Sequence, residues 1–98
     1  MYLRELEPIT TLRVETENSL YHISVLDPAS LDILVMGGPV SRVPMRARLE
    51  GASFGGSLLK QGYILSGMRM ELRLDGGRVI VTSPVQHITI ERGVPVAV

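Results

Sequence analysis

Residues 68–82 read MRMELRLDGGRVIVT, and this stretch decides the fold class. From Met68 to Leu74, methionine and leucine alternate with charged residues, a period of two that is typical of a strand with one buried face. The Asp-Gly-Gly sequence at 75–77 suits a tight turn, because glycine readily adopts positive φ angles. Val79 and Val81 follow as inward positions of a returning strand. The stretch therefore predicts a β-hairpin.

The same period of two recurs on both sides of this hairpin, and no segment has a convincing period of 3.6. Residues 2–6 and 28–32 are the best helix candidates, and each is about one turn long. A short all-β chain removes exposed sheet edges by curling its sheet. We therefore predict a single all-β domain over residues 1–98, a small partly open barrel or roll of six or seven short, mainly antiparallel strands. The further strands are expected at 11–17, 21–25, 33–36, 45–50 and 87–91.

Three segments depart from the alternation. The glycines of residues 51–62 predict a surface loop, and residues 93–98 a loose tail. Ser83-Pro84 interrupts a strand, because proline has no N–H to donate. Val85 and Ile88 lie three apart, so a bulge or a 3₁₀ turn is needed to bring both into the core.

Two short motifs resemble those of a family of small uncharacterised bacterial proteins with a mostly-β fold. They are Thr16-Glu17-Asn18-Ser19-Leu20-Tyr21, similar to a Thr-x-Asn-Ser-x-Tyr hairpin, and Thr82-Ser83-Pro84-Val85-Gln86-His87-Ile88, similar to a Thr-Ser-Pro-Val-x-x-Ile ending. The motifs cover 13 of the 98 residues. The resemblance implies a mostly-β fold. It implies no catalytic residue, because the family has no assigned activity. The residues of the first motif themselves predict a turn followed by a strand on which Tyr21 faces the core.

Composition excludes several kinds of site. Ten basic and ten acidic residues give a net charge of zero, so no overall field attracts the chain to nucleic acid or to an anionic membrane. Without cysteine there is neither a disulfide nor a thiolate metal site. The N-terminal residues are not those of a secretory signal, and no apolar run approaches the length of a membrane span. We expect a soluble, cytoplasmic protein that does not bind membranes.

Gly51-Ala52-Ser53-Phe54-Gly55 matches the G-x-S-x-G pattern of serine hydrolases, and Asp75 and His87 follow in the expected order. The context does not fit, because that motif joins a strand to a full helix in a much larger sheet. A phosphate-binding loop lacks its lysine, since Ser57 stands in that place. His22 and His87 are both expected on outward strand faces. We predict no enzyme activity, no metal and no cofactor.

Charge is distributed unevenly along the chain. Residues 1–36 carry a net charge of −4, and residues 37–98 carry +4. The arginines expected to face outward from neighbouring strands form a candidate interaction surface. Either they pair with glutamates across strands, or they bind a ligand or nucleic acid. Nucleic acid is the less expected ligand, because the chain has few aromatic residues for base stacking. The arginines are Arg46, Arg48, Arg69 and Arg73.

A second candidate surface is apolar. Leu58, Leu59 and Tyr63 lie in a segment that a small core does not readily cover, and so do the valines after Gly93. The sequence names no specific biochemical function. It favours a non-catalytic protein-interaction module or a subunit of a homo-oligomer, whose partner is a second copy or another protein. Binding of a ligand or of nucleic acid through the arginines is the alternative.

Overall fold

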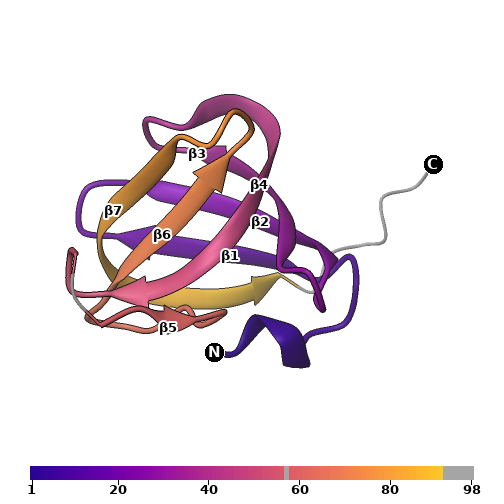
Figure 1. Ribbon diagram of the computed structural model, residues 1–98, viewed down its shortest axis with the longest axis horizontal. Helices are drawn as coiled ribbons and strands as arrows, with labels where there is room; N and C mark the ends of the chain where they lie inside the picture. The colour runs from indigo at the N-terminus through magenta and orange to yellow at the C-terminus, as the bar shows by residue number, and fades with distance from the viewer. Residues whose placement is uncertain (57, 92–98) are drawn as a thin grey trace.

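The computed structural model describes residues 1–56 and 58–91, and it is built almost entirely of strands (Figure 1). One 3₁₀ helix, η1, precedes the first strand. Alternating sequence forms the strands, and turns with glycine, proline or asparagine separate them. The elements are η1 (Leu3–Glu5), β1 (Thr11–Thr16), β2 (Leu20–Asp27), β3 (Asp32–Gly37), β4 (Ser41–Ser53), β5 (Lys60–Gln61), β6 (Arg69–Leu74) and β7 (Val79–Glu91).

Six of the strands close into an antiparallel barrel. Their order is β3-β2-β1-β7-β6-β4, and β3 also pairs with β4, which joins the two ends of the sheet. That closing ladder places Asp32 opposite Arg48 and Val35 opposite Met45. The predicted all-β class and small barrel are confirmed, and the β3–β4 pairing makes the barrel closed rather than partly open. Within the described residues, β5 is the strand left at an edge, paired only with β4.

The core fills the barrel, and short segments plug one end. Leu12, Ile23 and Leu72 are fully buried side chains from different strands. Leu3 of η1, Leu31 and Ile64 are also fully buried although they lie outside the strands. Several backbone hydrogen bonds hold the segment before β1, among them those from Leu3 N to Gly62 O at 2.8 Å and from Ile64 N to Met1 O at 2.9 Å. Figure 1 shows this segment beside β5.

The two longest strands, β4 and β7, bend around the barrel (Figure 1). In β7, His87 pairs with Glu15 but Val85 pairs with Thr16, so Gln86 is an extra residue. This bulge turns Val85 into the core, as predicted from the spacing of Val85 and Ile88. Ser83-Pro84 therefore bends a continuous strand and does not end it.

Two further sequence expectations need correction, and a third concerns residues that the structure does not describe. Val79 and Val81 are 40% and 46% exposed, because they pair with the outward residues Arg73 and Glu71. The predicted loop at 51–62 is narrower, since Gly51 to Ser53 belong to β4 and pair with β6. The expected tail at 93–98 lies outside the described residues. In residues 1–56 and 58–91, no helix has the length and apolarity required to cross a bilayer.

Candidate functional site

Apolar side chains from three segments gather around one surface depression of about 380 Å³. Phe54 is 61% exposed, Leu58 80% and Leu59 48%. Single exposed apolar residues are ordinary, whereas exposed apolar residues gathered around one depression make a candidate binding surface. We call this group the apolar surface. Its residues are Phe54, Leu58, Leu59, Lys60, Leu65 and Met68.

The turn between β4 and β5 positions most of the apolar surface. Ala52 pairs with Lys60, and Gly51 pairs with Gln61, so the intervening residues project beyond the end of β4. Leu58 has a φ of +51°. A left-handed backbone costs a non-glycine residue roughly 1–2 kcal/mol. Leu58 thus combines an unfavourable backbone conformation with an exposed apolar side chain.

Tyr63 does not line the apolar surface, although it was predicted with Leu58 and Leu59. Its ring stacks on Tyr2 with a centroid separation of 4.6 Å and an interplanar angle of 22°. The Lys60 ammonium lies 4.7 Å from the centre of the same ring. Ile64, in the same predicted segment, is buried in the core. Residues 58–65 are therefore divided between the surface and the plug of the barrel.

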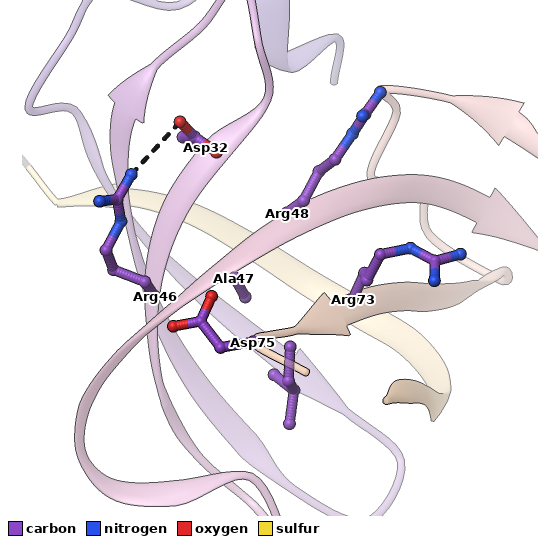
Figure 2. Close-up of a pocket in the computed structure, with 7 residues that line it drawn as sticks. Asp32, Arg46, Ala47, Arg48, Arg73 and Asp75 are labelled. Carbon is purple, nitrogen blue, oxygen red and sulfur yellow. Dashed lines mark hydrogen bonds and ion pairs between the residues drawn. The ribbon is translucent and has the colours of Figure 1, made fainter. Parts of the chain in front are cut away.

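A second depression, of about 330 Å³, is lined by three of the four predicted arginines (Figure 2). We call it the arginine pocket. Arg46 and Arg48 point outward from β4, and Arg48 pairs directly with Arg73 of β6. Two acidic side chains share the pocket. Its residues are Asp32, Arg46, Ala47, Arg48, Arg73, Leu74 and Asp75.

Two of the three arginines in the pocket, Arg46 and Arg73, form ion pairs with carboxylates. Arg46 Nη2 lies 3.4 Å from Asp32 Oδ2, and Arg73 Nε donates to Glu50 Oε1. Figure 2 shows Arg46 turned toward Asp32, while Arg48 and Arg73 extend away from it. Within residues 1–56 and 58–91, Arg48 has no ion pair within 4.0 Å. Cross-strand pairing, one of the two alternatives for these arginines, thus accounts for Arg46 and Arg73 but not for Arg48.

Arg69 does not belong to the arginine pocket. It lies at the other end of β6 from Arg73, opposite Ser53. Its guanidinium donates to the carbonyl oxygen of Thr82 at 3.1 Å, so this arginine braces β7. The sequence placed Arg69 and Arg73 on one face correctly. It did not show that a strand length separates their side chains.

The three residues of the G-x-S-x-G hypothesis do not meet. Ser53 is fully buried, and its Oγ accepts a hydrogen bond from Gly55 N at 3.2 Å. Asp75 follows the far end of β6, a strand of six residues that spans about 20 Å. His87 is exposed on β7 opposite Glu15. In the described part of the chain, no three acidic or histidine side chains are grouped to hold a metal ion.

Sequence reasoning missed Phe54, Met68 and Asp32 as members of these two depressions. Phe54 and Met68 lie on either side of the 58–65 segment in the sequence, so it is the β4–β6 pairing that brings both to one depression. Asp32 reaches the arginine pocket through the β3–β4 ladder that closes the barrel. Neither pairing has a sequence signal. The one usable hint was Phe54, a phenylalanine outside any alternating pattern and followed by two glycines, which suggests an exposed position. Family models, curated proteins and solved structures were all compared with this chain, and none matches it.

Proposed function

We propose that the protein is a non-catalytic interaction module that associates with a second copy of itself through the apolar surface. The observation that carries this proposal is the joint exposure of Phe54, Leu58 and Leu59 around one depression. Burying apolar area stabilises an association by about 25 cal/mol per Å² before the costs of binding are subtracted.

A second copy is the occupant that the chemistry favours. A two-fold interface places the same surface on both partners, so it must be complementary to itself. The charge of the apolar surface suits such an interface, since Lys60 is its one charged member among the lining residues named above and its ammonium lies over the Tyr63 ring. Two arginine pockets facing each other would instead place like charges together. Dimers with two-fold symmetry are also the commonest oligomers.

The test is sedimentation equilibrium of the full chain across the micromolar range, with Leu58→Ser as the disrupting variant. We expect the average mass to rise toward that of a dimer with concentration, and Leu58→Ser to weaken the association at least tenfold. Ile9→Ser is the matched control. Ile9 is 76% exposed and has a φ of +68°, much like Leu58, but it does not line the apolar surface.

Each outcome has a defined meaning. Association lost in Leu58→Ser and kept in Ile9→Ser supports the proposal. A monomer throughout the concentration range would overturn it, as would equal losses in both variants. A dimer unaffected by Leu58→Ser and by Phe54→Ser would place the interface elsewhere. The melting temperature of each variant shows whether its fold is intact.

A further inference from the structure

We propose that Arg48 and Arg73 form a binding site for a small tetrahedral oxyanion, of the phosphate or phosphate-monoester class. The site lies in the arginine pocket and is separate from the apolar surface. It does not depend on self-association. The inference rests on how β4 pairs with its two neighbours, and on which nitrogen atoms those pairings leave available.

Arg48 and Arg73 form a like-charge pair directly across two strands. In an antiparallel pair, opposite side chains have Cβ atoms about 4.5–5.5 Å apart, and like charges there are destabilising. On its other side Arg48 lies opposite Asp32, the carboxylate best placed to neutralise it. That carboxylate is engaged by Arg46. The closed ladder thus starts two exposed arginine side chains from directly opposite positions on β4 and β6, and the carboxylate opposite Arg48 binds a third arginine instead.

The available nitrogen atoms match a tetrahedral anion. Arg73 Nε donates a hydrogen bond to Glu50, and Arg73 Nη1 donates one to the carbonyl oxygen of Gly77 at 3.4 Å. The third nitrogen, Nη2, is therefore available to donate to a ligand. Within the described residues, Arg48 makes no hydrogen bond through its guanidinium. A phosphate has oxygen atoms enough to accept from both groups at once, and such charge-assisted bonds are the stronger ones. Bridging by a dianion would also remove the repulsion between the two arginines.

The acidic neighbours restrict the size of the ligand. Asp32 and Asp75 line the same pocket, on the side toward Arg46 (Figure 2). An extended polyanion passing over Arg48 and Arg73 would meet Asp32, Asp75 and Glu50 in turn, whereas a single phosphate group covers less of this surface and passes over fewer of the carboxylates. The pocket lining also contains no aromatic side chain on which a base could stack. A small phosphate therefore fits this pocket better than a nucleic-acid strand does.

The test is a titration of the full chain with inorganic phosphate, followed by NMR of the arginine Nε–Hε signals at a pH where phosphate is mainly dianionic. We expect saturable shifts at Arg48 and Arg73. Arg48→Gln should weaken binding at least tenfold, and Arg48→Lys should restore it only in part, because lysine lacks the planar fork. Arg13→Gln is the control, since Arg13 is an exposed arginine of β1 that does not line the arginine pocket.

Repeating the titration in Leu58→Ser separates this site from self-association. Saturable binding that persists there and is lost in Arg48→Gln supports the proposal. Shifts that do not saturate, or that sodium chloride of equal ionic strength reproduces, would overturn it. An equal loss in Arg13→Gln would mean general screening and would also overturn it. Tighter binding of a single-stranded oligonucleotide through the same arginines would replace the small anion with nucleic acid.

Discussion

Ser83 Oγ donates a hydrogen bond to Thr16 Oγ1 at 2.8 Å, joining two residues that lie 67 positions apart. The same Thr16 oxygen accepts from Ser19 N at 3.1 Å and donates to Ser19 O at 3.2 Å. Ser83 Oγ in turn accepts from Asn18 N at 3.0 Å. The β1–β2 turn and the bent middle of β7 are thus held together by two hydroxyl groups. These residues come from the two motifs that resemble the small bacterial β proteins, a resemblance that stays a prediction.

Thr16→Val tests this junction. Valine keeps the shape but removes the hydroxyl, which leaves Ser19 N and the hydrogen of the Ser83 hydroxyl without an acceptor in a part-buried place. We expect unfolding free energy to fall by about 1–3 kcal/mol, the cost of unsatisfied buried polar groups. Urea denaturation measures it. Thr10→Val is the control, because the Thr10 hydroxyl bonds Glu7 O in an exposed position. Equal losses in the two variants would contradict the junction's role.

Gly51→Ala tests the bulge that carries β5. A Cβ at Gly51 would lie 2.2 Å from the carbonyl oxygen of Lys60, so β5 must move away from β4. We expect a loss of more than about 2 kcal/mol, since backbone overlap adds to the cost of the left-handed conformation. Gly76→Ala is the comparison, because no atom lies within 4 Å of its added Cβ. Thermal unfolding that ranks the two alanine variants in the reverse order would disprove this account.

Tyr21 should make stability depend on pH in the alkaline range. Burial raises the pKa of the Tyr21 phenol above its usual 10.0, and the hydrogen bond with Ser19 opposes part of this rise. The folded state therefore favours the protonated phenol. This contribution is complete below pH 10.0 and is lost as the pH rises through the raised pKa of Tyr21.

Comparing urea denaturation of the wild-type protein and Tyr21→Phe on both sides of pH 10.0 checks this expectation. The difference in unfolding free energy between the two proteins should shrink as the pH rises. Other groups that titrate in this range affect both proteins alike and cancel in the difference. A constant difference would show that the Tyr21 phenol has the same pKa in both states.

Ser53→Ala should act on stability and not on chemistry. The fully buried Ser53 hydroxyl accepts from Gly55 N, so its removal should lower the unfolding free energy by about 1 kcal/mol. Ser66→Ala, in an exposed turn, should change it by less than about 0.5 kcal/mol. A fluorophosphonate probe should not label the folded protein. Stoichiometric labelling that disappears in both Ser53→Ala and His87→Ala would overturn the non-catalytic proposal.

The alternation of apolar and charged residues was sufficient to predict the buried side chains of strands that face water on one side. Leu12 and Val14 alternate with charged residues and turn inward as expected, and residues 68–74 do the same. The spacing of Val85 and Ile88 also predicted the bulge in β7. In each case the prediction rests on the period of two of a strand. This constraint acts between residues close together in the chain, so a short stretch of sequence is enough to show it.

Where the local sequence pattern did not show which side chains face the core, the pairing between strands determined it. Val79, Ile80 and Val81 are all apolar, so no period shows which of them faces inward. The answer comes from β6, because Ile80 pairs with the buried Leu72 while Val79 pairs with the outward Arg73. A shift by one residue would have reversed every side chain of that strand.

Pairing between distant strands also determines both candidate sites, the arginine pocket and the apolar surface. Arg48 and Arg73 become neighbours through the β4–β6 ladder, and Arg48 loses Asp32 to Arg46 through the β3–β4 ladder. Phe54, Leu58 and Met68 meet because β5 and β6 both pair with the end of β4. The sequence by itself determined the all-β class, the turns and most buried faces, since these follow from short-range backbone geometry. Only the tertiary structure decided barrel closure and the two surfaces, because register between strands is set by the packing of the whole core.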